Sequence, residues 1–327
     1  MESFRARRGR RARLSRHRSL LYGALATVVV LGGTAAGTAY VKARPYSGGR
    51  AVSSAASSSA VASEEASVEP VVRPTVDAVD RDELLASAMK AIDVPDGVGL
   101  AVAVLDLESG EGASYGDGAF DTASIVKVDI LAALLLKAQD EGRELTAAEK
   151  SRATAMIESS DNASASELWR TIGQAAGLDA ANERLGLAQT EGGEGMLWGL
   201  TQTTAADQLR LLRQVFGAKE SELSGASRTY LSGLMGRIAV GQQWGVSAAA
   251  DGSAWALKNG WLPRTATGLW DINSIGRVTA EGRDYLVAAL SDGNATQARG
   301  VSLVEAASVA AVSVFAGQDA SAAAAYQ

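Results

Sequence analysis

Two residues one helical turn apart could carry out nucleophilic chemistry in this chain. Ser124 stands just before an apolar run that extends to Leu136, and Lys127 lies within that run. Because residues three apart share a helix face, the Ser124 Oγ and the Lys127 amine can meet. A helix that is apolar almost all round must be buried, and burial lowers the pKa of a lysine. A neutral amine beside a hydroxyl is a general base beside a nucleophile.

The composition of the 327-residue chain limits the groups that could serve as a base. There is no cysteine, and the single histidine, His17, lies in an arginine-rich N-terminal run. The folded part therefore has no Ser-His-Asp triad, no Cys-His pair and no histidine or thiolate ligands for zinc. A hydrolase of this composition needs lysine or a carboxylate as its base. The net charge of −6 argues against a nucleic acid partner.

The N-terminal segments predict a membrane protein. Residues 1–18 form a basic tail, and residues 19–41 carry no charge over a length that can span the ~30 Å hydrocarbon core. The positive-inside rule places the tail in the cytoplasm and the rest of the chain outside. We therefore predict an uncleaved transmembrane signal-anchor at 19–41, and a single-pass protein of the cell membrane. A cleaved signal peptide is the alternative, because the small residues Thr34 to Ala36 allow cleavage.

Composition also marks the boundaries of the folded part. Residues 42–79 are rich in serine and alanine and contain proline, which predicts a disordered linker. Residues 80–316 carry periodic apolar patterns and form one predicted domain of about 240 residues. Residues 317–327 are predicted to be a flexible tail. The oligomeric state is not readable from these patterns.

The folded part changes pattern twice along its length. Strand-like runs occupy residues 98–107, 110–116, 254–260, 268–275 and 284–290. Helix-like runs occupy residues 80–90, 124–139, 146–158, 163–172, 203–216, 227–238 and 300–315, and a glycine-rich loop covers 186–200. Strands from both ends of the chain thus enclose a block of helices. We predict an α/β (α+β) fold, with an antiparallel sheet flanked by helices and an inserted all-helical subdomain.

Two later triplets supply partners for the serine and the lysine. A Ser-x-x-Lys spacing alone is a weak signal, because Ser87 and Lys90 repeat it on an ordinary amphipathic helix. Ser160-Asp161-Asn162, however, stands at a break between helices, and Lys258-Asn259-Gly260 ends a strand. Taken singly, the first triplet reads as a helix cap and the second as a solvated strand end. In this order and in these contexts, the three motifs resemble those of class A β-lactamases and penicillin-binding proteins.

The resemblance covers nearly all of residues 80–316 and implies roles for the catalytic candidates. Ser124 would be the acylated nucleophile, and Lys127 would be its base or would orient it. Ser160 would relay a proton to the leaving nitrogen. Lys258 would supply positive charge that helps to keep Lys127 neutral and attracts a substrate carboxylate. Asp161 is expected to be structural.

The resemblance also implies how a substrate binds. The expected contacts come from Asn162, Asn259, Gly260 and Trp261, and the backbone N–H groups of Ser124 and Trp261 would form the oxyanion hole. The implied substrate is a small molecule, either a β-lactam or a D-alanyl peptide derived from peptidoglycan. The mechanism is covalent and needs no metal or other cofactor.

The chain departs from the family pattern at three places. The link between Ser124 and Ser160 is short, and Asn259 replaces the usual threonine or serine of the third motif. Glu191 and Glu194 could activate the deacylating water, but neither stands in the family's Glu-x-x-Leu-Asn context, and both also read as solvated loop carboxylates. The leading hypothesis is a membrane-anchored serine hydrolase. The alternative is a catalytically silent or slowly deacylating penicillin-binding-like protein that binds peptidoglycan fragments or a protein partner.

Overall fold

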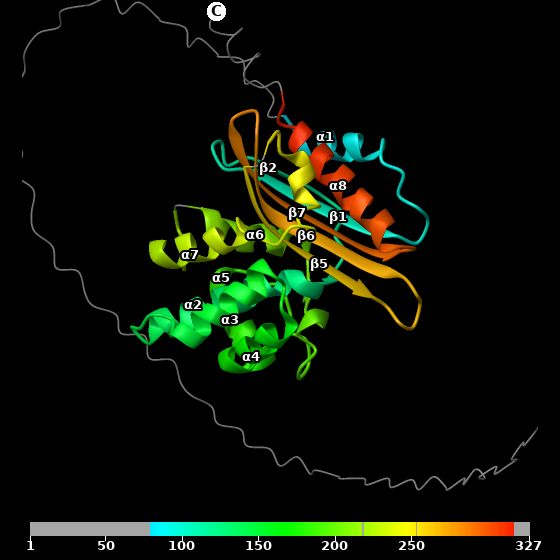
Figure 1. Cartoon of the computed structure of the whole chain (residues 1–327). Coiled ribbons are helices and arrows are strands. Elements are labelled where there is room, and N and C mark those ends of the chain that lie inside the picture. Colours follow the sequence, from blue (N-terminus) through cyan, green and yellow to red (C-terminus); the bar gives the residue numbers. More distant parts are fainter. Residues whose placement is uncertain (1–78, 218, 253, 317–327) are drawn as a thin grey trace, which may run out of the picture. The chain divides into compact units, whose positions relative to one another are not determined.

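A five-stranded antiparallel sheet organises the part of the chain that is described, residues 79–217, 219–252 and 254–316 of a computed structural model. Its strands lie in the order β2-β1-β7-β6-β5 (Figure 1). They are β1 (Gly99–Asp106), β2 (Gly112–Tyr115), β5 (Trp255–Pro263), β6 (Trp270–Ala280) and β7 (Arg283–Asn294). The first strand pairs with the last one, β7. The predicted antiparallel sheet, built from both ends of the chain, is confirmed.

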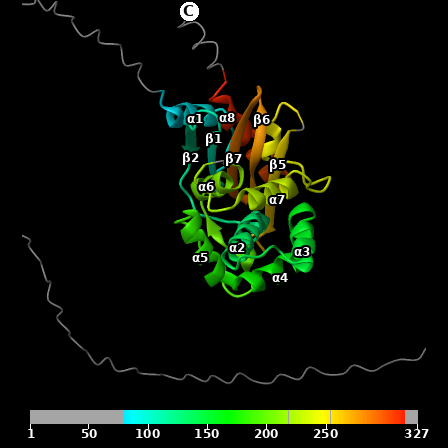
Figure 2. The ribbon, with the colours of Figure 1, turned by 90° about the vertical axis from the view of Figure 1, so that its left-hand side faces the viewer.

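Two helices from opposite ends of the domain cover one face of the sheet (Figures 1 and 2). They are α1 (Arg81–Met89) and α8 (Gln297–Ser313). Leu85 of α1 and Val304 of α8 join Val104 and Val287 of the sheet in one buried apolar cluster. Burial of such side chains is worth roughly 1.5–3 kcal/mol each, which holds this outer layer on the sheet.

The helical block lies on the other face of the sheet (Figure 2). In the described part it contains α2 (Val126–Asp140), α3 (Ala147–Glu158), α4 (Asn162–Ile172), α5 (Gln174–Leu185), α6 (Ala205–Phe216) and α7 (Gly225–Met235). Helix α2 is buried along nearly its whole length, as its apolar sequence predicts. Thr146 and Glu149 form the expected capping box of α3. The inserted helical subdomain is therefore present.

Two details differ from the sequence prediction. Ser124 lies in a 3₁₀ turn, η1 (Ala123–Ile125), rather than in the helix itself. Helix α5 was not predicted, because its start has no side-chain cap and its only large apolar residues are Leu178 and Leu185. Its start at Gly173 has a φ of 99°, a left-handed conformation that favours glycine and lets the chain turn sharply from α4 into α5.

Apart from Val79, the predicted tail, anchor and linker at 1–18, 19–41 and 42–79 lie outside the described residues, as does the tail at 317–327. Among the helices that are described, none is both long and apolar enough to cross a bilayer. The membrane prediction therefore stays a prediction.

Candidate active site

Three of the predicted catalytic residues meet at the Lys127 amine. Its Nζ atom lies 2.9 Å from Ser124 Oγ and 3.0 Å from Ser160 Oγ. It also lies 2.8 Å from the Ser160 carbonyl oxygen and 2.8 Å from Asn162 Oδ1. The Lys127 side chain has no solvent exposure, whereas Ser124 is partly exposed. The arrangement places a buried amine behind a hydroxyl that a substrate can reach.

The surroundings of Lys127 favour its neutral form. Burial lowers the pKa of Lys127 to about 7, and the Asp161 carboxylate opposes this shift. A neutral amine has two N–H groups and a lone pair. The Ser160 carbonyl and Asn162 Oδ1 can accept the two N–H groups, and the lone pair is then available to the Ser124 hydroxyl proton. This is the geometry that a general base requires.

Lys258 completes the polar cluster from the sheet. Its Nζ atom lies 3.1 Å from Ser160 Oγ and donates to the Asn259 carbonyl oxygen at 2.9 Å. Burial, and then the nearby Lys127 charge, lower the pKa of Lys258 to about 7. The Ser160 hydroxyl therefore lies between two buried amines and can pass a proton between them.

The break between α3 and α4 presents Ser160 to both amines. Ser160 has a φ of 56°, which is unusual for a residue with a side chain. The next residue, Asp161, caps α4 by accepting a hydrogen bond from the Ser164 backbone N–H at 2.7 Å. The cap fixes the start of α4, and Asn162 at its first position reaches Lys127.

The sheet holds the turn that carries Ser124. Asn273 of β6 is fully buried and donates to the carbonyl oxygens of Asp121 and Thr122 at 2.9 and 3.1 Å. A Cβ atom on Gly260 of β5 would lie 2.6 Å from the Thr122 oxygen and 2.8 Å from the Ser124 nitrogen. Only glycine fits there. Sequence analysis missed Asn273, although a polar residue in the middle of a buried strand opposite Gly260 was a usable signal.

Asn259 and Trp261 face away from the polar cluster. Alternate residues of a strand point to opposite faces, so these two side chains lie on the face opposite Lys258 and Gly260. Asn259 is fully buried, and its Nδ2 atom donates to the carbonyl oxygens of Gln242 and Trp244 at 2.7 and 3.0 Å. Both amide hydrogens are thus used within the protein, which leaves none for the substrate contact predicted from the sequence. The Trp261 ring packs against that of Trp244, with centroids 6.1 Å apart.

The glycine-rich loop brings an aromatic ring, rather than a carboxylate, to Lys127. Lys127 Nζ lies 5.0 Å from the ring centroid of Trp198, in the turn η2 (Trp198–Leu200). The Trp198 indole N–H donates to Ser166 Oγ at 3.2 Å. Glu191 and Glu194 are exposed, and in the described part neither carboxylate is hydrogen-bonded to Lys127 or Ser124. Sequence analysis missed Trp198, which stands in the short apolar group Met196 to Trp198.

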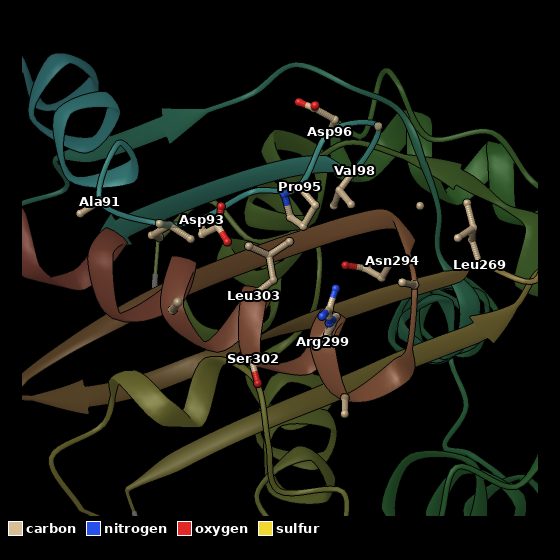
Figure 3. A pocket seen from close by; sticks show the side chains of 16 residues that line it. Ala91, Asp93, Pro95, Asp96, Val98, Leu269, Asn294, Arg299, Ser302 and Leu303 are labelled. Atoms are coloured by element: carbon tan, nitrogen blue, oxygen red, sulfur yellow. The ribbon is translucent and has the colours of Figure 1, made fainter.

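A separate hollow of about 890 Å³ lies on the outer side of the sheet, beside α8. Val98, Leu269, Arg299 and Leu303 are among the residues that line it (Figure 3). None of the candidate catalytic or binding residues does so. Within the described residues, no group of aspartates and glutamates is arranged to hold a metal ion.

The sequence model of the beta-lactamase enzyme family matches residues 150–315, about half of the chain. The chain belongs to the beta-lactamase enzyme family. The match begins after Ser124 and Lys127, and it includes Ser160 and Lys258. No curated protein sequence matches significantly.

Solved structures of the family share the fold. The TLA-3 extended-spectrum beta-lactamase is 18% identical, with a TM-score of 0.62 over 72% of this chain and 99% of that one. PBP-A is 22% identical, with a TM-score of 0.61 over 71% and 96% of the two chains. A class A representative from Bacteroides cellulosilyticus DSM 14838 is 16% identical, with a TM-score of 0.61 over 73% and 99%. The predicted beta-lactamase-like fold is confirmed.

Proposed function

We propose that this member of the beta-lactamase family is a serine hydrolase that forms an acyl-enzyme at Ser124. One observation carries the proposal: the buried Lys127 amine lies 2.9 Å from Ser124 Oγ and has a pKa lowered to about 7. A substantial fraction of Lys127 is then neutral at neutral pH and can accept a proton. The chain has no cysteine, and its one histidine is His17, outside the hydrolase domain.

Acylation follows from the contacts of these side chains. Lys127 takes the Ser124 hydroxyl proton while Oγ attacks the carbonyl carbon of the substrate. The oxygen that becomes negative is met by the backbone N–H groups of Ser124 and Trp261, each worth about 2.7–4 kcal/mol to the transition state. Lys127 then passes the proton to Ser160, and Ser160 gives it to the leaving nitrogen as the C–N bond breaks. The positive charge of protonated Lys258 stabilises this relay.

The substrate class that we propose is a β-lactam or a D-alanyl peptide from the cell wall. Both offer a carbonyl carbon bonded to nitrogen, which the serine and the relay require. Among the similar structures, TLA-3 is described as an extended-spectrum beta-lactamase, and a PBP-A variant is described as an acyl-enzyme complex with penicillin G. Because the Asn259 amide is occupied, we expect substrate carboxylates to depend on the Lys258 charge.

We propose further that the acyl-enzyme is long-lived. Rapid hydrolysis needs a carboxylate that activates water, and the Trp198 ring lies beside Lys127 on the loop side of the site. Glu191 and Glu194 are exposed, and among the described residues neither carboxylate is hydrogen-bonded to the cluster. This supports the slowly deacylating, penicillin-binding-like alternative over a fast β-lactamase. Replacing both glutamates by glutamine is expected to leave the lifetime of the penicillin adduct unchanged, whereas a prolonged lifetime would identify one of them as the base.

Intact-protein mass spectrometry after exposure to penicillin G tests the proposed function. The wild type should gain the mass of one acyl group, and the Ser124→Ala variant should gain none. Ser87→Ala is the matched control, because Ser87 has the same spacing to Lys90 but both residues are exposed. Absence of labelling by penicillin, nitrocefin and fluorophosphonate probes alike would overturn the proposal. Retained binding of peptidoglycan fragments in such an unlabelled protein would indicate the catalytically silent alternative.

The proposed location is the outer side of the cell membrane. The uncharged segment at residues 19–41 and the preceding basic tail support an anchored protein with its domain outside the cytoplasm. Cell-wall peptides and β-lactams are accessible on that side.

A further inference from the structure

Asp129 on α2, the helix that carries Lys127, and Asp207 on α6 are both fully buried. Their hydrogen-bond partners differ greatly. Asp207 of α6 accepts hydrogen bonds from Arg210, the Gln189 backbone N–H and the Thr190 hydroxyl, at 2.5, 2.7 and 2.9 Å. Asp129 of α2 has one side-chain partner, Gln208 Nε2, at 3.3 Å from its Oδ1 atom. No described cation pairs with Asp129. An ionised Asp129 would therefore be a buried and uncompensated charge, which is costly.

The contact between Asp129 and Gln208 leaves one oxygen on each group without a partner. Gln208 Nε2 donates to Asp129 Oδ1 and to Thr203 Oγ1, the latter at 3.0 Å. Asp129 Oδ2 and Gln208 Oε1 are both buried and unpaired. Two acceptors cannot satisfy each other. One proton on Asp129 Oδ2 supplies the donor that both atoms lack and also removes the buried charge.

We propose that Asp129 is a neutral carboxylic acid in the folded protein, joined to Gln208 as a closed acid–amide pair. Its Oδ2–H group donates to Gln208 Oε1, while Gln208 Nε2 donates to Asp129 Oδ1. The pair links α2 to α6 through buried polar groups. Asp129 lies two residues after Lys127 in α2. Asp129 is thereby a positioning residue for the helix that carries the base. Burial raises the pKa of Asp129 to about 7, and the negative charge of Asp207 adds to this shift, in agreement with the contacts.

The pair belongs to a chain of buried contacts that reaches the nucleophile turn. Thr203, which accepts from Gln208, is hydrogen-bonded to Thr190 at 2.8 Å. Thr203 belongs to β4 (Gln202–Thr203), which pairs with β3 (Phe120–Asp121), and β3 ends three residues before Ser124 in the chain. Ionisation of Asp129 would disturb this chain, because the facing charged group on α6 is another carboxylate, Asp207, held by Arg210.

The pH dependence of the protein's stability depends on how many protons Asp129 binds in the folded and unfolded states. Asp129 has an ordinary pKa of 3.8 when unfolded and about 7 when folded. The folded protein therefore holds one more proton between these pH values, so the contribution of Asp129 to stability falls as pH rises across that window. Asp129→Asn keeps a neutral side chain that can donate to Gln208 Oε1 and should remove this fall. Asp106→Asn, which alters a buried aspartate hydrogen-bonded to Ser109, should leave the fall in place.

Carbon-13 NMR of the full-length protein, labelled at the aspartate carboxyl groups, tests the proposal without reference to catalysis. We expect one carboxyl resonance to titrate near pH 7, and Asp129→Asn to remove it. Burial raises the pKa of Asp271 to about 6, so Asp271→Asn should remove a second, lower titration and leave the first. A wild-type protein in which every aspartate other than Asp271 is ionised by pH 6 would overturn the proposal.

Discussion

Opposing effects on Lys127 decide whether Ser124 has a base. Burial lowers the pKa of Lys127, while the nearby Asp161 carboxylate raises it. The same Asp161 caps α4, so its charge and its hydrogen bond have separate consequences. The order of the motifs alone assigns Asp161 a structural role, and the contacts add an electrostatic effect on the base.

Asp161→Asn separates these two roles. The amide oxygen of asparagine can keep the Ser164 cap, but the negative charge beside Lys127 is lost. The pKa of Lys127 should then fall further, and the acid limb of the acylation–pH profile should move to lower pH. Stopped-flow acylation by a chromogenic cephalosporin measures the shift. An unchanged limb with an intact fold would exclude an electrostatic effect of Asp161.

Sequence reasoning located the residues of the cluster better than their supports. Ser124, Lys127, Ser160, Asn162 and Lys258 were selected from motif order, and they lie within hydrogen-bonding distance of at least one other member. Asn273 and Trp198 were not selected. Their roles depend on which strand lies opposite Gly260 and on how an irregular loop folds back. Neither is encoded in a local periodicity.

At the scale of the elements, β5 and β6 together hold the turn η1 that carries Ser124. Gly260 lies against the turn that carries Ser124, with no room for a side chain. The buried helix α2 then fixes Lys127 one turn later. The apolar run predicted α2, but the residues just before Val126 form the 3₁₀ turn η1, which lies against Gly260 of β5. Helix α5 has no side-chain cap at its start and only two large apolar residues, so its sequence gives a much weaker signal.

Gly260→Ala tests the contact between the strand and the turn. The added methyl group would overlap the Thr122 oxygen and the Ser124 nitrogen, so the turn must move. Displacement of about 1 Å costs catalysts roughly 100-fold, and we expect a loss of that size in the acylation rate. Gly252→Ala is the control, because its new Cβ would have no atom within 4 Å. Equal rates for both variants would show that the close contact is unimportant.

The whole domain is closed by pairing between its two ends. Strand β1 lies beside β7, and α1 and α8 cover the same face, so the helical block is held between segments far apart in the sequence. The succession of strand-like and helix-like runs along the sequence predicted this order of elements and therefore the fold class. They could not predict the register of β1 against β7, which depends on packing against both helical layers.

Removal of residues 1–78 tests the proposed anchor at the scale of the molecule. All described contacts of the site lie within residues 79–316, so the shortened protein should keep its acylation rate. It should move from the membrane fraction to the soluble fraction, because the uncharged segment is gone. Immunoblots of fractionated cells measure the change. A full-length protein recovered only as a shortened soluble product would indicate the cleaved signal peptide instead.

The pH dependence of Ser124 acylation tests the central claim that neutral Lys127 activates Ser124. The second-order rate constant for labelling by penicillin G should rise with pH on the acid side, as Lys127, with its pKa of about 7, becomes neutral. It should fall again at higher pH, where Lys258 loses the positive charge that the relay uses. Lys127→Ala should abolish labelling, while Lys90→Ala, which alters an exposed lysine at the same spacing from a serine, should match the wild type. A flat profile, or wild-type labelling of Lys127→Ala, would contradict the account.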